Sequence, residues 1–178
     1  MRGVSVPWWI AGGWAVELHL GRRTRPHADI DLGVWRDDVP TLTSEASGWE
    51  FHVAKDGVLT PHSPGAALPR GTHVLWVRRS GGPWSLELLA ETREGGMWTY
   101  RRDPRVRRPA ATLTRTAGGF RVIAPEVQLL YKSKDVRPKD QADFDLVAPT
   151  LDAQARRWLA DALAVAMPGH PWIAELGG

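Results

Sequence analysis

Residues 8–32 constrain the fold of this 178-residue chain more than any other segment. The apolar run before Gly12 and Gly13 indicates a short buried strand, and the stretch after them indicates a helix. A basic segment then leads to Asp29 and Asp31, which alternate with apolar residues as in a strand. Residues i and i+2 of a strand point to the same face. The segment therefore predicts a strand, a turn, a helix and a second strand that carries two carboxylates on one face.

These features fit the chemistry of phosphate and divalent metals. Two carboxylates that project together can bind a pair of cations about 3.5–4 Å apart, as in two-metal phosphoryl transfer. A glycine turn at a helix N-terminus exposes backbone N–H groups that suit phosphate. Each feature alone has an ordinary explanation, because paired glycines often form a tight turn and a D-x-D pattern often lies on a solvated strand edge. Their close succession predicts a magnesium–nucleotide site, with Asp29 and Asp31 as metal ligands and Gly12 and Gly13 at the phosphates.

The same block, GGWAVELHLGRRTRPHADIDL, closely resembles the aminoglycoside 2″-adenylyltransferases and their lincosamide-modifying relatives. These enzymes lie within the nucleotidyltransferase superfamily that includes the DNA polymerase β palm. The resemblance is dense over residues 8–35 and can be traced to about residue 147; it departs at Glu17, where the family usually carries aspartate. The positions that match the shared motif are Gly12, Gly13, Trp14, Ala15, Gly21, Arg22, Thr24, Arg25, His27, Asp29 and Asp31.

The resemblance implies both a fold and an activity. The fold is of the α+β class, a polymerase β palm-like mixed sheet flanked by helices, with C-terminal helices. The activity is the transfer of a nucleoside monophosphate, AMP from ATP in the first instance, to a hydroxyl group of a small acceptor. Two Mg²⁺ ions and ATP or another nucleoside triphosphate are the implied cofactors, and an aminoglycoside or lincosamide antibiotic is the implied acceptor, which would make the protein an antibiotic-resistance factor.

A third carboxylate, Glu87, lies between two leucines of an apolar strand. A charge in such a strand is costly to bury without a partner, so Glu87 either faces solvent or faces Asp29 and Asp31 from a neighbouring strand. The resembling enzymes carry an aspartate in this strand as a metal ligand, a general base, or both. The resemblance therefore implies that Glu87 completes the metal site and helps to deprotonate the acceptor hydroxyl, with Glu91 as the alternative.

Basic residues near the aspartates predict phosphate contacts. Arg22 and Arg25 lie between the glycine turn and the metal strand, where the β- and γ-phosphates should sit. The block YKSKDVRPKDQADF also resembles the family and carries Lys132, which could neutralise the triphosphate. His27 is equally well explained as a structural brace or as a functional residue.

For the other charged residues, the sequence pattern favours a structural role over a catalytic one. Lys139, Asp140 and Asp143 have the spacing of an ion-pair network at the start of a helix. The run RRDPRVRR at 101–108 is typical of a solvated loop.

The remaining pattern predicts one continuous unit, with a catalytic core over 1–124 and a helical segment over 125–178 packed on it. A short helix is expected in 36–48, a loop or weak hairpin over 55–71, and a hairpin turn at Gly118–Gly119. Proline at position 125 marks the start of the helices. The predicted strands are WEFHVAK, THVLWVRR and WSLELLAE, and the predicted helices include PEVQLLYKSKD, KDQADFDLVAPTL and LDAQARRWLADALAVAM.

The composition of the chain limits the scaffolds, compartments and binding partners that we expect for it. The chain has no cysteine, which excludes disulfide and zinc–thiolate scaffolds, and its formal net charge is +3. There is no run of 18 apolar residues and no signal-peptide core, so we expect a cytoplasmic protein with no membrane partner. Similar enzymes carry a helix before the first strand, whereas seven residues precede Trp8 here. We therefore expect either an earlier native start or a homodimer that covers this surface, with tryptophans suited to an interface.

Two other functions remain open. The clustered arginines are compatible with a nucleotidyltransferase that modifies a protein or an RNA, as in toxin–antitoxin systems, although a nucleic acid is not the expected partner. The two aspartate-to-glutamate departures, at Glu17 and Glu87, are compatible with a catalytically silent nucleotide-binding homologue.

Overall fold

The computed structural model describes residues 3–177. The strands are β1 (Trp8–Ile10), β2 (Ile30–Trp35), β3 (Trp49–Lys55), β4 (Val58–His62), β5 (Val74–Arg79), β6 (Trp84–Glu94), β7 (Met97–Thr99), β8 (Arg107–Pro109), β9 (Thr114–Ala117) and β10 (Phe120–Ile123). The helices are α1 (Gly12–Leu20), α2 (Val39–Glu45), α3 (Pro125–Lys132), α4 (Pro138–Val147), α5 (Ala153–Ala166) and α6 (Trp172–Gly177), with 3₁₀ turns η1 (Arg36–Asp38), η2 (Ala110–Thr112) and η3 (Ala148–Thr150).

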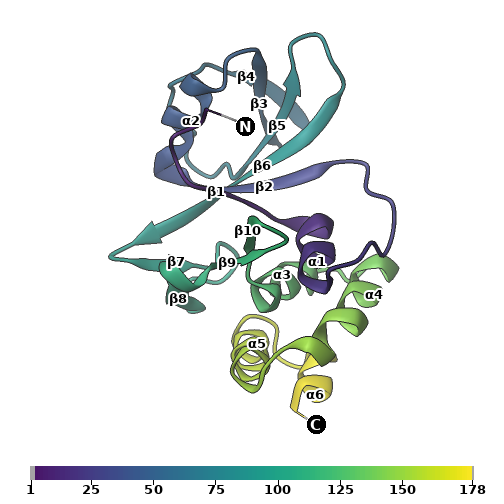
Figure 1. Cartoon of the computed structure of the whole chain (residues 1–178). Helices are drawn as coiled ribbons and strands as arrows, with labels where there is room; N and C mark the ends of the chain where they lie inside the picture. Colours follow the sequence, from purple (N-terminus) through teal and green to yellow (C-terminus); the bar gives the residue numbers. More distant parts are fainter. Residues whose placement is uncertain (1–2, 178) are drawn as a thin grey trace.

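The strands form one mixed sheet in the order β4-β3-β5-β6-β2-β1-β10-β9, and β7 and β8 extend from β6. At its centre β2 and β6 are parallel, whereas β1 runs antiparallel to β2 and parallel to β10. Figure 1 shows α2 beside the strands at one end of the molecule, while α1 and α3 to α6 gather at the other. This mixed sheet flanked by helices, with helices at its C-terminal end, confirms the predicted fold class.

Alternation along β2 divides the interior into two hydrophobic clusters. Leu32 and Val34 belong to the cluster that includes α2, whereas Trp35 belongs to the cluster that includes α1 and α3 to α6. Because successive side chains of a strand point to opposite faces, one strand contributes to both clusters. The second cluster joins residues on both sides of position 124, and the division of the chain at that position stays a prediction.

Most predicted elements are present, and the differences have local causes. Residues 58–62, within the predicted loop, form β4 and pair with β3. The two glycines open α1 instead of preceding it, because Ala11 is the N-cap. The hairpin turn at Gly118–Gly119 is confirmed by the pairing of β9 with β10. Within residues 3–177, no helix combines the length and the apolar character needed to cross a membrane.

Residues 101–106 form a mostly exposed loop, as predicted, but β8 begins at Arg107 and two arginines of the run contact α3. Arg102 donates to the carbonyl of Tyr131 at 2.9 Å, and Arg108 pairs with Glu126 at 2.7 Å. The arginines of this run therefore join the β7–β8 connection to α3, because their long side chains reach backbone and carboxylate acceptors on that helix.

Candidate active site

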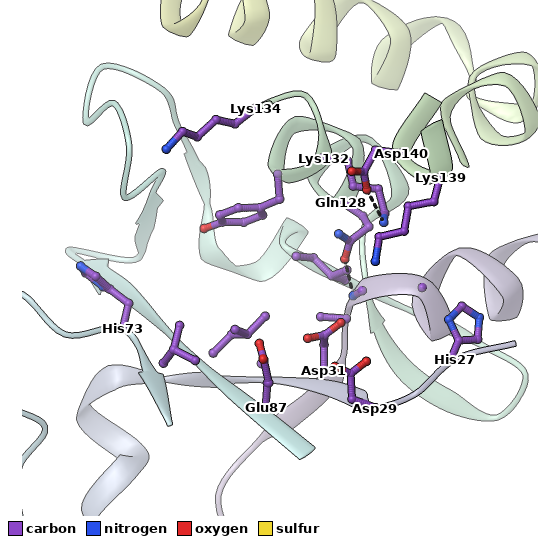
Figure 2. A pocket seen from close by; sticks show the side chains of 18 of the residues that line it. His27, Asp29, Asp31, His73, Glu87, Gln128, Lys132, Lys134, Lys139 and Asp140 are labelled. Atoms are coloured by element: carbon purple, nitrogen blue, oxygen red, sulfur yellow. Dashed lines mark hydrogen bonds and ion pairs between the residues drawn. The ribbon is translucent and has the colours of Figure 1, made fainter. Parts of the chain in front are cut away.

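Three carboxylates meet on the floor of a cavity of about 650 Å³. Asp31 of β2 lies directly opposite Glu87 of β6, and Asp29 immediately precedes the first residue of β2. Figure 2 shows all three carboxylates directed into the cavity. The parallel pairing of β2 with β6 produces this arrangement, since paired residues of neighbouring strands share a face of the sheet. Glu87 thus faces the aspartates and not bulk solvent.

The electrostatics of this cluster favour a bound cation. Burial raises the pKa of Asp31, and the carboxylate of Asp29 raises it further. Burial likewise raises the pKa of Glu87, with Asp31 and then Asp29 adding to the effect. Asp29 therefore disfavours the ionised form of Asp31, and both aspartates disfavour that of Glu87; a cation among the three would relieve this repulsion.

The donor set suits magnesium completed by substrate. Within residues 3–177, no three histidine, aspartate or glutamate side chains form a ready-made metal centre. Mg²⁺ is commonly held by one or two carboxylates together with water and substrate phosphates, so a partial set of hard oxygen ligands fits it. The residues present therefore fit the implied metal when a nucleotide supplies the remaining oxygens.

Gly12 brings the start of α1 against the carboxylate of Asp31. Its φ is +65°, and a Cβ at this position would overlap Asp31 Oδ2. Its N–H donates to Oε1 of the α3 residue Gln128 at 2.6 Å. This differs from the prediction that both glycines offer N–H groups to phosphate, because in this structure a side-chain amide already accepts from Gly12.

Gly13 accommodates the ring of His27. A Cβ on Gly13 would overlap this ring and the guanidinium of Arg25. Arg25 Nη1 lies 3.0 Å from His27 Nδ1, and His27 Nε2 lies 3.1 Å from Glu17 Oε1. The side chain of His27 is 5% exposed. Of the two explanations for this histidine, its contacts favour the structural brace.

Glu17, the first departure from the family, lies away from the metal carboxylates. Its Oε1 accepts from the backbone N–H of Thr24 at 2.7 Å and from that of Arg25 at 3.0 Å. Burial alone would raise the pKa of Glu17, but these hydrogen bonds and the contact with His27 outweigh it and hold the pKa at about 2. Glu17 therefore stays ionised and ties the loop before β2 to α1.

Lys132 forms part of an ion-pair network and is not a free cation. It is buried, with its Nζ 2.8 Å from Asp143 and 3.3 Å from Asp140. Asp143 also pairs with Arg25 at 3.4 Å, and Asp140 accepts from Arg137 at 2.6 Å. The predicted network is therefore present for both aspartates, but Lys132 takes the place predicted for Lys139.

Lys139 is exposed and lines the cavity. Figure 2 shows its amine directed toward Asp31; the charges of Lys132 and then of Lys139 lower the pKa of that aspartate, but burial and Asp29 outweigh them. The structural role preferred for Lys139 is therefore wrong, since Lys132 already neutralises the buried aspartates. Arg22 is exposed and is absent from the described residues that line the cavity, whereas Arg25 lines it.

The sequence analysis did not predict several of the residues that line the cavity. Gln128 could have been found as a polar residue on the buried face of an amphipathic helix, at a position that an apolar residue would normally take. Arg101 and Arg102 follow a strand, but nothing in the sequence shows that the strand delivers them to the cavity. His73 and Tyr131 also line it and carry no local signal.

Sequence comparison identifies relatives of the N-terminal segment. Residues 1–57 match the family model described as aminoglycoside-2″-adenylyltransferase. A 2″-aminoglycoside nucleotidyltransferase of Escherichia coli is 61% identical over 28 residues, which are 16% of this chain and 16% of that protein. This match therefore spans about a sixth of the length of the curated relative.

Structural comparison covers most of the chain. The crystal structure of ANT(2″)-Ia in complex with adenylyl-2″-tobramycin has a TM-score of 0.58 and 18% identity over 90% of this chain and 88% of that one. The lincosamide antibiotic adenylyltransferase LnuA in its lincomycin-bound form has a TM-score of 0.53 and 18% identity over 80% and 85%. At this identity the two structures show the shared fold. Together the comparisons confirm the resemblance: residues 1–57 match the model of the aminoglycoside-2″-adenylyltransferase family, and the chain shares the fold of these two nucleotidyltransferases.

Proposed function

We propose that this protein is a Mg²⁺-dependent nucleotidyltransferase that transfers a nucleoside monophosphate, AMP from ATP in the first instance, to a hydroxyl group of a small acceptor and releases pyrophosphate. The observation that carries the proposal is the meeting of Asp29, Asp31 and Glu87 on the cavity floor, opposite a wall that holds Lys139. Carboxylates on one side and cations on the other suit a metal-bound triphosphate between them.

Each carboxylate has a distinct task in this proposal. Asp29 and Asp31 would hold Mg²⁺, and Glu87 would complete the ligand set. Bound Mg²⁺ would stabilise the charge that develops on the transferred phosphoryl group and the pyrophosphate. Glu87 also accepts the proton of the acceptor hydroxyl, a role that its place opposite Asp31 at the cavity supports.

The basic side chains that would bind the triphosphate differ in how firmly the protein holds them. Lys139 is exposed and flexible, and it can follow the phosphates as a point charge. Arg25 is held by Asp143 and His27 and presents a fixed guanidinium at the cavity. The backbone N–H of Gly13, in the first turn of α1, adds the positive end of the helix dipole. Lys132 acts indirectly, because it fixes α4 and thereby the position of Lys139.

The relatives suggest the class of acceptor. One is described as a 2″-aminoglycoside nucleotidyltransferase, and the two structures contain an adenylylated tobramycin and lincomycin. By analogy, a hydroxylated antibiotic of either class is the first candidate acceptor for this chain.

The test is pyrophosphate release with Mg²⁺ and each nucleoside triphosphate, measured against aminoglycosides, lincosamides and simple hydroxylated acceptors. We expect release that depends on the acceptor, and a loss of at least about 100-fold in Asp29→Asn because the variant lacks a metal carboxylate. Unchanged release in Asp29→Asn would contradict the assigned metal site. No release with any acceptor, despite Mg²⁺–nucleotide binding, would instead support a macromolecular target or a silent homologue.

A further inference from the structure

One buried polar side chain at the cavity uses only half of its hydrogen-bonding capacity within the protein. Gln128 of α3 is 6% exposed and lines the same cavity as Asp31. Its Oε1 accepts from the N–H of Gly12, the first residue of α1, at 2.6 Å. Figure 2 shows this side chain reaching from α3 to the start of α1. Because a buried polar group is costly without a partner, the other end of this amide requires an explanation.

The contact with Gly12 fixes the direction in which the Gln128 amide points. The oxygen is the only acceptor of a side-chain amide, so the oxygen must face the Gly12 N–H and the nitrogen must face away from it. Within residues 3–177, Gln128 Nε2 donates to no protein atom, and it is not one of the fully enclosed atoms that lack a partner. Its two N–H donors are therefore free and can be reached from the cavity.

This amide takes the place of one more peptide group at the N-terminus of α1. Its C=O accepts from the first N–H of the helix, and its own N–H groups point onward, as those of a preceding peptide group would. Hydrogen bonds in such a chain polarise one another, and the positive end of the helix dipole reinforces them. Gln128 thus carries forward the donor that Gly12 has given up. Donors at the N-terminus of a helix suit phosphate.

The position of the free donor favours the phosphates of the nucleotide over the acceptor. A Cβ on Gly12 would overlap Asp31 Oδ2, so the start of α1 is in contact with a carboxylate that the proposed function assigns to Mg²⁺. Phosphate oxygens commonly complete the ligand set of such an ion. The amine of Lys139 is directed toward the same carboxylate. A triphosphate bound here would place oxygens within reach of Gln128.

We propose that Gln128 binds the nucleotide directly: its Nε2 donates to a phosphate oxygen of the triphosphate, while its Oε1 holds the start of α1. The phosphate donor at this helix N-terminus then comes from α3 and not from the backbone of Gly12. The inference rests on the proposed function, which places a metal-bound triphosphate beside Asp31.

The side-chain amide resonances of the protein provide a direct test. The chain has no asparagine, and its glutamines are Gln128, Gln141 and Gln154. Gln141→Met and Gln154→Met therefore assign two of the NH₂ signals and leave that of Gln128 by elimination. Mg²⁺ and the α,β-methylene analogue of ATP, in which the bond that transfer would break is replaced, are titrated into the wild-type protein.

We expect the NH₂ signal of Gln128 to shift and its protons to exchange with solvent more slowly. The exposed Gln154 serves as the control and should not change. Adenosine, which lacks phosphate, should leave the Gln128 signal unchanged. An unchanged Gln128 signal at saturation with the ATP analogue would overturn the inference, and so would an equal shift with adenosine.

Two substitutions separate the free donor from the support of α1. Gln128→Glu keeps an oxygen for the Gly12 N–H but replaces the free donor with an oxygen, whereas Gln128→Met lacks both. A hydrogen bond to a charged group contributes enough that each variant should raise the KM for the nucleotide about 10- to 100-fold, with the KM for the acceptor unchanged. Gln154→Met should leave both KM values unchanged.

The two variants also control for each other. Gln128→Glu adds a negative charge that repels phosphate, so the uncharged Gln128→Met must show the loss as well. A wild-type nucleotide KM in Gln128→Glu would show that the side chain only supports α1 and would overturn the inference. Thermal unfolding checks that both variants fold, and the resonance test on wild type depends on neither of them.

The binding measurement separates failure of this inference from failure of the proposed function, because it needs no acceptor and no turnover. If no acceptor reacts but the Gln128 signal responds to Mg²⁺ and the ATP analogue, the proposed function fails and the phosphate contact stands. If pyrophosphate release depends on an acceptor but the Gln128 signal does not respond, the contact fails and the proposed function stands.

Discussion

At the scale of single residues, α1 begins so close to β2 that its first position admits only glycine. Gly12 combines a positive φ with van der Waals contact to Asp31, and its N–H is held by Gln128. Glu17, one turn further on, serves the loop before β2 and does not reach the metal carboxylates. Of the two aspartate-to-glutamate departures, only the one at Glu87 therefore lies at the cavity.

Gly12→Ala should reduce both stability and activity. Alanine at positive φ costs about 1–2 kcal/mol, and the overlap with Asp31 adds about 1–3 kcal/mol and displaces the carboxylate. Gly71→Ala is the matched control, because Gly71 has a φ of +73° and open space where its Cβ would lie. Urea unfolding and pyrophosphate release measure the two effects. Equal destabilisation in both variants, with full activity, would contradict the contact with Asp31.

Glu17 should make stability depend on pH. Burial opposes its ionisation, but backbone hydrogen bonds from Thr24 and Arg25 lower the pKa from 4.5 to about 2. Because the folded pKa lies below the unfolded one, the carboxylate stabilises the fold above pH 4.5, and this contribution is lost as the pH falls toward 2. We expect Glu17→Gln to cost about 2–3 kcal/mol near pH 7 and about 1 kcal/mol near pH 3.

Urea unfolding of wild type and variant at both pH values tests this expectation. Glu94→Gln, at an exposed glutamate of β6, should cost the same small amount at both. A cost of Glu17→Gln that does not change between the two pH values would show that the ionised carboxylate is not what holds the loop.

At the scale of elements, ion pairs and one amide fix the helices around the cavity. The N-terminus of α1 is joined to α3 by Gln128, and α3 is joined to α4 by Lys132 with Asp140 and Asp143. The basic run after β7 joins α3 from the other side. These contacts leave Lys132 paired with two buried aspartates, whereas Lys139 is exposed at the cavity.

Lys132 and Lys139 should therefore respond differently to substitution. Lys132→Met leaves two buried aspartates without their shared cation and should cost about 3–5 kcal/mol of stability. Lys139→Gln should leave the unfolding transition unchanged and raise the KM for the nucleotide, because its amine faces the cavity. Thermal unfolding and nucleotide-dependent kinetics distinguish the two roles. A stable Lys132→Met with a raised nucleotide KM would restore Lys132 as the phosphate-binding lysine.

At the scale of the whole molecule, two hydrophobic clusters share one sheet. Leu88 and Leu75 are fully buried in the cluster with α2, and Leu129 is fully buried in the cluster with the other helices. β2 contributes side chains to both clusters. Because the two clusters share this strand, loss of packing on one face of the sheet should also disrupt packing on the other face. Trp9, Trp98 and Trp172, among the tryptophans suggested for an interface, are buried within the second cluster.

The chain should consequently unfold in one transition. Leu88→Ala and Leu129→Ala should each cost about 2–5 kcal/mol and should lower the midpoint of the same transition, although they lie in different clusters. Calorimetry and circular dichroism during heating provide the measurement. A transition that splits in two in either variant would show that the clusters fold independently.

The sequence determined the elements at the centre of this protein, because their signals are local. The alternation that carries Asp29 and Asp31, the glycines that open α1 and the proline at the start of α3 each act within a few residues. The family resemblance rests on the same short block. Only the tertiary structure placed Glu87 opposite Asp31, paired Lys132 with Asp140 and Asp143, and brought Arg101 to the cavity. These facts depend on strand pairing and on competition among charges that are distant in sequence, which no local pattern encodes.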